Sequence, residues 1–488
     1  MRHPLELYRA EQVRELDRRA IEGHGIPGYE LMCRAASAAF DRLRARWPEV
    51  RTISVFCGAG NNGGDGYVLA RLALEAGFDV QLIALKAPAD LSGDALRAAQ
   101  DWLQAGGTVD EAEASIHGAL LVDALLGTGL DRAPSGPYAE LIDRINAHPA
   151  PVLSLDLPSG LNADTGQAPG ACVRAELTVT FIALKRGLFT GGAGAFTGQL
   201  LLDALDVPET LAEDLPADAR LLEAAELARC LPSRPCHTHK GETGHVLVIG
   251  GDLGMSGAPV LSGQAALRTG SGLVSLATRG ATAAAALAVQ PELMVHSVDN
   301  PDALKARIGA ADVLALGPGL GRSDWSQAMW SEAMKSARPM VLDADGLYWL
   351  AQRPRERQQL IITPHPGEAA MLLGTTSQAI QADRFQAVRS LADRYSAVAV
   401  LKGWGSLVAT PDGQVEVCPF GNPAMASAGM GDALTGIIAS LLGQGLAAFD
   451  AARVGVLAHA LAGDRAARGR RQILASDLIT ALAEVLPA

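Results

Sequence analysis

The chain carries two long series in which short, wholly apolar runs alternate with segments of helical periodicity. In the first half the apolar runs cover residues 52–57, 80–85, 120–124, 152–155, 177–182 and 200–202. In the second half they cover residues 245–249, 274–277, 313–316, 340–342, 360–362 and 398–401. Runs that are apolar throughout are typical of parallel strands that helices cover on both faces. Each series therefore predicts a doubly wound α/β domain, and the first one a Rossmann-like parallel sheet.

A change of composition separates the two series. Residues 206–235 contain four prolines among acidic and alanine-rich stretches and have no strand-like run. We place the domain boundary here, which gives domains of residues 1–215 and 216–488. An amphipathic helix is expected at residues 10–22 and a second helix at residues 29–46.

Composition and charge narrow the class of protein. A chain of 488 residues with 49% hydrophobic and 19% charged residues is long enough for two or three folded domains. The formal net charge of −12 argues against a nucleic-acid surface. Six cysteines without a CxxC pair favour a reducing, cytoplasmic environment. No apolar stretch approaches the ~18 residues that a membrane span needs, so we expect no membrane partner.

Two glycine-rich loops, residues 58–65 and 428–432, each end on an aspartate and lead into an apolar helical pattern. The unpartnered N–H groups and the dipole at a helix N-terminus attract anions. A carboxylate in the same turn repels a phosphate unless it acts as a base or a metal ligand. The two loops therefore indicate phosphate-handling sites with chemistry, rather than binding alone.

In the second half, further loops follow the predicted strands at residues 250–258, 317–321, 363–368 and 402–406. Ligands of open α/β sheets bind beyond the carboxyl ends of the strands, so these loops are expected to converge on one crevice. Phosphoryl transfer needs an anion hole, which Gly429 and Gly431 can provide, and a base, for which Asp432 is the candidate. This arrangement resembles the ribokinase-like superfamily of small-molecule kinases. The plainer alternative is that Asp432 only caps its helix.

In the first half, residues 61–65 follow a buried strand but lack the GxGxxG spacing. No acidic residue stands at the end of the next strand to meet a ribose, which argues against an ordinary nicotinamide dehydrogenase. Oxygen ligands from Asn62, Asp123 and Ser159, all near strand ends, suit a hard cation. Asp156 then remains for proton transfer.

Four motifs together resemble the bifunctional NAD(P)H-hydrate repair enzymes. They are GAGNNGGDGYVLAR (58–71), DLPSGLNADTG (156–166), TPHPGE (363–368) and GNPAMASAGMGDALTG (421–436). The resemblance spans nearly the whole chain. In that family the amino-terminal domain epimerises the R and S forms of hydrated NADH or NADPH. The carboxy-terminal, ribokinase-like domain dehydrates the S form at the expense of ADP, giving AMP and phosphate.

The resemblance implies a set of site residues. The epimerase substrate would be held by Asn61, Asn62, Gly63, Gly64, Asp65, Gly127, Thr128, Gly129, Leu130, Asp131, Arg132, Ala133, Tyr138 and Asp156. Potassium would lie near Asn62, Asp123 and Ser159. The dehydratase would hold the hydrated nicotinamide near Ala258, Gly319, His365 and Asp432. ADP with magnesium would bind along Lys402, Gly403, Trp404, Gly405, Ser406 and Gly431. The family also suggests a homo-oligomer.

The expected chemistry agrees with these residues. In a hydrated nicotinamide the C6 hydroxyl lies next to the ring nitrogen, whose lone pair expels it as water when an acid assists, and Asp156 is the candidate proton carrier. Phosphorylation of the same hydroxyl would make a better leaving group, with Asp432 as base. A vitamin-precursor kinase fused to a nucleotide-binding regulatory domain is the main alternative, but it leaves residues 61–65 and Asp156 without a role. A nucleotide-sensing scaffold without turnover is a second alternative.

Overall fold

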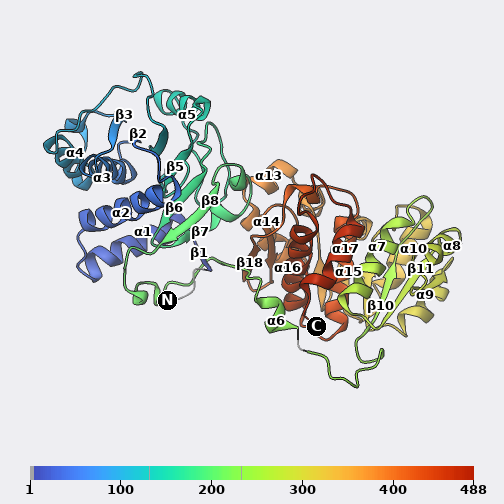
Figure 1. Cartoon of the computed structure of the whole chain (residues 1–488). Coiled ribbons are helices and arrows are strands. Elements are labelled where there is room, and N and C mark those ends of the chain that lie inside the picture. The colour runs from blue at the N-terminus through green and yellow to red at the C-terminus, as the bar shows by residue number, and fades with distance from the viewer. Residues whose placement is uncertain (1–4, 131, 232, 488) are drawn as a thin grey trace. The chain divides into compact units, whose positions relative to one another are not determined.

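The computed structural model describes residues 5–130, 132–231 and 233–487 (Figure 1). It divides into two compact units, Met1–Arg220 and Leu221–Ala488, which we describe one at a time. The boundary expected after residue 215 lies a few residues before this division. Within the described residues, no helix is both long and apolar enough to cross a lipid bilayer.

Unit 1 is built on a six-stranded, all-parallel sheet in the order β3-β2-β4-β5-β6-β8. The strands are β2 (Thr52–Cys57), β3 (Asp79–Ala84), β4 (Leu120–Ala124), β5 (Val152–Leu155), β6 (Leu177–Phe181) and β8 (Gln199–Asp203). All six coincide within a residue with the expected apolar runs. The central strands β4, β5 and β6 are buried along their whole length, which explains why their sequences do not alternate.

Helices cover both faces of this sheet, as Figure 1 shows. The covering helices are α2 (Gly28–Arg46), α3 (Asn61–Glu75), α4 (Gly93–Gln104) and α5 (Pro137–Ala147), whereas α1 (Ala10–Arg18) packs against Tyr8 and Leu31. Val55 packs with α2, α3 and α4 on one face, and its neighbour Phe56 packs with α5 on the other. The helix expected over residues 10–22 is α-helical only to Arg18 and continues as a π-helical turn, Arg19–Gly23.

Helix α3 begins inside the glycine-rich loop, at Asn61, so residues 61–65 form its first turn rather than a loop before it. Glycine is required there because the chain folds back closely on itself. A Cβ atom on Gly63 would lie 2.1 Å from the carbonyl oxygen of Gly58. The close return brings the first turn of α3 to the carboxyl end of β2.

Three short strands complete unit 1. β1 (Glu6–Tyr8) pairs in parallel with β7 (Leu184–Lys185), and antiparallel with β9 (Ala219–Leu221) through Ala219 and Arg220. The expectation that residues 206–235 hold no strand is therefore wrong. A three-residue strand is too short to give a recognisable pattern in the sequence.

Unit 2 contains the strand order β12-β11-β10-β13-β14-β15-β16-β17-β18, parallel as far as β16 and antiparallel beyond it. The strands are β10 (His245–Ile249), β11 (Leu273–Thr278), β12 (Met294–Ser297), β13 (Val313–Leu316), β14 (Met340–Leu342), β15 (Leu360–Ile362), β16 (Val398–Leu401), β17 (Ser406–Ala409) and β18 (Val415–Cys418). The six expected strands are present, and β12, β17 and β18 are additional. The two doubly wound α/β domains that the sequence predicts are thus confirmed.

The helices of unit 2 are α6 (Glu226–Cys230), α7 (Gly257–Thr269), α8 (Gly280–Val289), α9 (Pro301–Ile308), α10 (Asp324–Ala333), α11 (Asp345–Gln352), α12 (Pro366–Leu373), α13 (Ser377–Ala382), α14 (Arg384–Tyr395), α15 (Met430–Gly443), α16 (Ala448–Ala466) and α17 (Ala475–Val485). Helix α15 is buried along most of its length and packs closely against α7. A Cβ on Gly436 would lie 2.0 Å from the carbonyl oxygen of Ser262, so glycine permits this approach. The packing fixes the N-terminus of α15 beside the strand ends.

Candidate active sites

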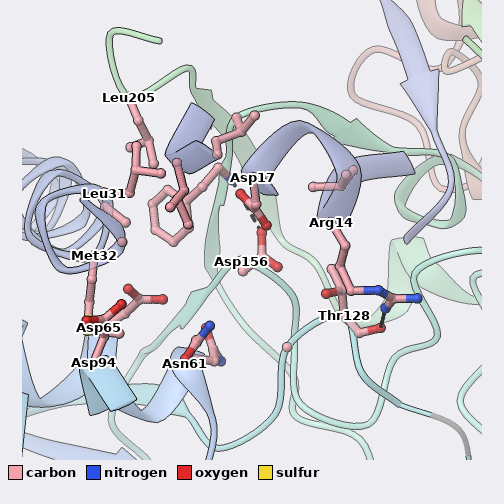
Figure 2. A pocket seen from close by; sticks show the side chains of 18 of the residues that line it. Arg14, Asp17, Leu31, Met32, Asn61, Asp65, Asp94, Thr128, Asp156 and Leu205 are labelled. Carbon is pink, nitrogen blue, oxygen red and sulfur yellow. Dashed lines mark hydrogen bonds between the residues drawn. The ribbon is translucent and has the colours of Figure 1, made fainter. Parts of the chain in front are cut away.

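Unit 1 has a pocket at the carboxyl end of its sheet, drawn in Figure 2. Its polar lining comes from six separate parts of the chain. These residues are Arg14 and Asp17 from α1, Asn61, Asn62 and Asp65 from α3, Asp94 from α4, Thr128 and Asp156 from loops, and Lys185 from β7. Parallel strands end at the same edge of a sheet, which is why residues so distant in sequence converge.

Asp156 directly follows β5 and adopts a left-handed backbone conformation, with φ of 64°. Its amide N–H donates to the carbonyl of Val179 at 2.7 Å, which holds this strained turn in place. The carboxylate oxygen Oδ1 accepts hydrogen bonds from Thr180 Oγ1 at 3.2 Å and from the Phe181 amide at 3.3 Å. The strain and the bonds aim the carboxylate into the pocket.

Lys185 is the cation that faces Asp156, and the sequence analysis missed it. Its side chain is 1% exposed, and its Nζ lies 2.5 Å from Asp156 Oδ1. The same ammonium donates to Thr180 Oγ1 at 2.9 Å and to the Phe181 carbonyl at 2.8 Å. A lysine that follows a buried apolar strand was the available signal, because such a lysine rarely lies in a core without a partner.

Two further carboxyl groups in the pocket have raised pKa values. Burial, with the charges of Asp156 and Asp17 nearby, raises the pKa of Asp65 well above its usual range. Burial raises the pKa of Asp17 to about 6, although the charge of Lys185 opposes the shift. Strongly shifted carboxyls around a buried lysine are typical of a site that moves protons.

Asn62, Asp123 and Ser159, the three expected cation ligands, lie together beside the pocket. Asp123 is fully buried and accepts hydrogen bonds from Ser154 Oγ, from the Leu125 amide, and from both the amide and the hydroxyl of Ser159. Burial raises the pKa of Asp123. Asn62 donates to the Leu126 carbonyl at 3.1 Å, but its buried Oδ1 has no hydrogen-bond partner among the described residues. A buried amide oxygen without a partner, in the same region as a buried carboxylate, is an environment that suits a monovalent cation.

Only some of the expected substrate residues of unit 1 line the pocket. Asn61, Asn62, Asp65, Gly127, Thr128 and Asp156 line the pocket. Gly63 and Gly64 are buried inside the packing of α3, where a Cβ on Gly64 would lie 2.5 Å from Met32 Cε. Gly129, Leu130, Arg132, Ala133 and Tyr138 are not among the residues that line the pocket. Asp131 lies outside the described residues, and its substrate contact stays a prediction.

In unit 2, Asp432 lies in the first turn of α15. Gly429 precedes this helix with φ of 88°, a left-handed conformation that favours glycine. Burial, together with the charge of Asp343, raises the pKa of Asp432 to about 7, while Lys402 opposes the shift. The carboxyl therefore changes its protonation state near neutral pH, as a general base should.

Lys402 and Asp343 form a buried ion pair beside this helix end. Lys402 Nζ lies 2.7 Å from Asp343 Oδ1 and 3.7 Å from Glu368 Oε2. Thr435 Oγ1 donates to the other oxygen of Asp343 at 2.8 Å. A Cβ on Gly431 would lie 3.2 Å from Lys402 Nζ, so the glycine loop touches the cation. The sequence analysis missed Asp343, although it stands at the carboxyl end of a predicted strand, and it included Glu368 only as part of the loop 363–368 without giving it a role.

A second pocket, of about 420 Å³, opens next to this ion pair in unit 2. Of the expected nucleotide residues, Lys402, Gly403, Trp404, Ser406 and Gly431 line it and Gly405 does not. The remaining lining is mostly apolar and was not expected. It includes Phe420, Asn422, Met425, Met430, Leu434 and His459. A mixed apolar and polar pocket of this size suits a purine nucleoside.

His459 and Trp404 are two ring side chains that line this pocket. Burial lowers the pKa of His459 to about 4, and Nε2 of the neutral ring donates to the Met430 carbonyl at 3.0 Å. Trp404 is 40% exposed, which is unusual for so large an apolar side chain. Its indole is therefore free to stack on a planar ligand.

The four residues expected to hold the nicotinamide in unit 2 are not among those that line this pocket. Gly319 and Ala258 lie together, because a Cβ on Gly319 would come within 3.3 Å of Ala258 Cβ. His365 caps α12, and its Nδ1 accepts from the amides of Gly367 and Glu368 at 3.0 and 3.3 Å. The His365 side chain is 57% exposed. Its contact with substrate stays a prediction.

Comparisons with known protein families match both units. A family model described as YjeF-related protein N-terminus matches residues 28–187. A second family model, described as NAD(P)H-hydrate dehydratase, matches residues 246–486. The two matches lie in different units and together account for most of the chain.

The chain is also similar to whole proteins. It is 47% identical over 476 residues to the bifunctional NAD(P)H-hydrate repair enzyme Nnr of Coxiella burnetii, and the aligned region covers 97% of each chain. It is 45% identical over 489 residues to the enzyme of the same name from Escherichia coli, covering 99% of this chain and 94% of that one. A ribokinase-like superfamily protein of known structure from Enterococcus faecalis is 25% identical, with a TM-score of 0.52, and covers 55% of this chain and 95% of that one.

Proposed function

Because the chain belongs to the family of bifunctional NAD(P)H-hydrate repair enzymes, we propose that it returns hydrated NADH and NADPH to their reduced forms in two steps. Residues 1–215 epimerise the R and S forms, and residues 216–488 dehydrate the S form at the expense of ADP. One observation carries the proposal. The similarity covers both units, and each unit holds a candidate catalytic aspartate near a lysine, Asp156 with Lys185 and Asp432 with Lys402.

In unit 1 the substrate ring would enter the pocket between α1 and the end of β5, with Asp156 at the reacting carbon. The ring nitrogen's lone pair expels the C6 hydroxyl as water, and water adds again from the other face. Lys185 holds Asp156 in a fixed direction, because the ammonium contacts Oδ1. Asn61, Asn62, Asp65, Gly127 and Thr128 would hold the rest of the ring and its neighbouring phosphate.

Potassium is proposed to lie at Asn62, Asp123 and Ser159. The unpartnered buried oxygen of Asn62 supports this assignment, as does the buried carboxylate of Asp123. When bound, the ion would neutralise part of the local negative charge and order the loop that carries Thr128. The four hydrogen bonds that Asp123 already accepts would hold its oxygens in place for the ion.

In unit 2 the adenosine of ADP would fill the pocket lined by Trp404 and His459, with the phosphates over Gly431 and Lys402. Asp432 takes the proton of the C6 hydroxyl, whose oxygen attacks the β-phosphorus while the bond to the α-phosphate breaks and AMP leaves. The ring nitrogen then expels phosphate from C6, and loss of a C5 proton forms the ring double bond. This route gives NADH or NADPH, AMP and phosphate.

Magnesium is proposed to enter bound to the phosphates of ADP, where its charge assists phosphoryl transfer. Within the described part of the crevice, Asp343 and Glu368 are already turned toward Lys402. We therefore assign the ion no protein ligand. Its partners in this account are the phosphate oxygens and water.

We propose that the protein works in the cytoplasm and assembles into a homo-oligomer. The six cysteines are all free thiols, which supports a reducing cytoplasm. Assembly into a homo-oligomer stays a prediction. The vitamin-kinase alternative accounts for unit 2 alone, whereas the similarity to repair enzymes covers both units.

The test is to incubate the protein with a mixture of R and S hydrated NADH, with and without ADP. The near-ultraviolet absorbance of the dihydronicotinamide ring should return completely with ADP and hardly at all without nucleotide. No recovery with either ADP or ATP would refute the function. With ¹⁸O in the C6 hydroxyl of the S form and the variant Asp156→Asn, which stops unit 1 from exchanging that hydroxyl with water, the label should appear in the released phosphate. Label found only in water would then refute the phosphorylated intermediate.

A further inference from the structure

Asp17 is a carboxyl group in the pocket of unit 1 that the proposed function leaves without a role. It lies near the end of α1 and is half-buried, and Figure 2 shows it at the same pocket as Asp156. Among the residues that the structure describes, no hydrogen bond or ion pair engages its carboxyl. Asp156, in contrast, accepts bonds from Lys185, Thr180 and Phe181. A half-buried carboxyl that the protein leaves without a partner is available to a ligand.

Epimerisation at C6 requires proton transfer on both faces of the ring. The departing hydroxyl needs a proton as the C6–O bond breaks and the nitrogen lone pair forms the C6=N1 bond. The water that adds from the opposite face must lose a proton as its oxygen bonds to C6. One carboxylate, held on one side by Lys185, serves only one of these faces.

We propose that Asp17 is the second proton-transfer residue of the epimerase, an inference that rests on the proposed function. Protonated Asp17 gives its proton to the hydroxyl that leaves from one face, and Asp156 takes a proton from the water that adds at the other. The opposite reaction exchanges the two roles. The two carboxyls then return to their starting states by proton exchange with solvent through the mouth of the pocket.

The neighbouring charges favour Asp17 over the other groups in the pocket. The three N–H donors of Lys185 are all engaged, at 2.5, 2.9 and 2.8 Å, so the lysine does not pair with Asp17. Arg14 turns toward the Thr128 carbonyl at 3.4 Å, and Asp94 lines the pocket from α4.

Asp17 and Asp65 differ in their pKa. Burial raises the pKa of Asp17 to about 6, against the charge of Lys185, so both protonation states are populated near neutrality. Burial raises the pKa of Asp65 well above its usual range, which favours its protonated form. Asp65 suits a fixed hydrogen-bond donor, whereas Asp17 suits a group that gives and takes a proton.

The test compares Asp17→Asn and Asp17→Glu in the full chain with Glu11→Gln, an exposed carboxylate on the same helix. Interconversion of R and S hydrated NADH is followed by chromatography without nucleotide, after subtraction of the rate without enzyme. Dehydration of the pure S form with ADP serves as an internal control, because it needs only unit 2.

Asp17→Asn should lower kcat for interconversion by about 10²-fold or more with KM changed little. Asp17→Glu should keep substantial activity with a displaced pH profile, and Glu11→Gln should match the wild type. Interconversion by Asp17→Asn within threefold of the wild type, or a loss confined to KM, would overturn the role of Asp17 while the proposed function stands. Equal failure of Asp17→Asn and Asp17→Glu, with hydrogen exchange of unit 1 unchanged, would also overturn it. If the wild type itself does not interconvert the two forms, the proposed function fails instead.

Discussion

The ammonium of Lys185 lies 2.5 Å from the carboxylate of Asp156, and the lysine side chain is almost wholly withdrawn from solvent. The pair stands at the carboxyl end of the sheet in unit 1, where a strained backbone turn presents the aspartate to the pocket. A buried ion pair of this kind stabilises a charge in a defined position more than it stabilises the fold. Its main consequence is that the carboxylate of Asp156 points in a fixed direction, into the pocket.

Removal of one partner should therefore cost both stability and activity. Lys185→Met leaves Asp156 without its cation and should reduce the stability of unit 1 by about 3 kcal/mol. The double variant Lys185→Met/Asp156→Asn should cost less than the sum of the two single changes. Hydrogen exchange of the β6 amides measures this stability in the full chain, with the exposed Lys86→Met as control. Strict additivity would contradict a coupled pair.

The pH dependence of dehydration should report Asp432. A base acts in its ionised form, so kcat/KM should fall as the pH drops through about 7, the raised pKa of this carboxyl in the free protein. The substitution Asp432→Asn should lower kcat by about 10²–10⁴-fold at pH 8. Asp393→Asn, an exposed change on α14, is the matched control. A flat profile between pH 6 and 8 would exclude Asp432 as the base.

The same carboxyl should destabilise unit 2 at high pH. Its pKa in the folded protein, about 7, lies above the ordinary aspartate value of 3.8, so the folded state binds the proton more tightly than the unfolded state. Stability from this group is therefore present below about pH 4 and is lost as the pH rises toward 7. At pH 8, Asp432→Asn should raise the midpoint of thermal unfolding of unit 2 while it abolishes dehydration. A lower midpoint would contradict the assigned burial cost.

Potassium should stabilise unit 1 through Asn62. At equal ionic strength, the unfolding midpoint of unit 1 should be higher in potassium chloride than in tetramethylammonium chloride. Asn62→Leu should remove this difference, because the unpartnered oxygen is lost. Asn146→Leu breaks bonds to Cys172 and Arg174 elsewhere in the unit and should lower both midpoints equally. Identical midpoints for the wild type in the two salts would argue against the ion.

Trp404 should contribute to nucleotide affinity by stacking. Trp404→Ala should raise the Kd for ADP about 3–10-fold, in keeping with about 0.5–1.5 kcal/mol for an aromatic pair. Leu287→Ala, also an exposed apolar residue of unit 2, is the control. Isothermal titration gives both constants. An unchanged Kd for Trp404→Ala would mean that the adenine ring of ADP does not stack on Trp404.

The sequence predicted the strands of unit 1 because each is buried along its length and carries an unbroken apolar run. It missed β12, whose residues 294–297 are partly exposed, because an edge strand has no need of an apolar run. It assigned residues 58–65 to a loop although α3 begins at Asn61, since glycine and asparagine are poor helix formers. Tertiary packing overrides that preference here.

The sequence predicted the site residues that belong to a recognisable motif. It missed those that only the packing of the chain brings to the site. Asp156 and Asp432 stand in recognisable loops. Lys185, Asp17 and Asp343 reach their sites only because strands and helices far apart in sequence end at the same sheet edge. A single sequence does not reveal which lysine or aspartate will be drawn into such a pocket. Their partners and distances supply that information.

The most direct test of two independent sites on one chain is the fate of the pure R form of hydrated NADH, given to Asp432→Asn with ADP present. The account predicts that the R form converts to a mixture of R and S at the wild-type rate, while no NADH absorbance returns. Loss of the R-to-S conversion in this variant, or recovery of NADH at the wild-type rate, would contradict it.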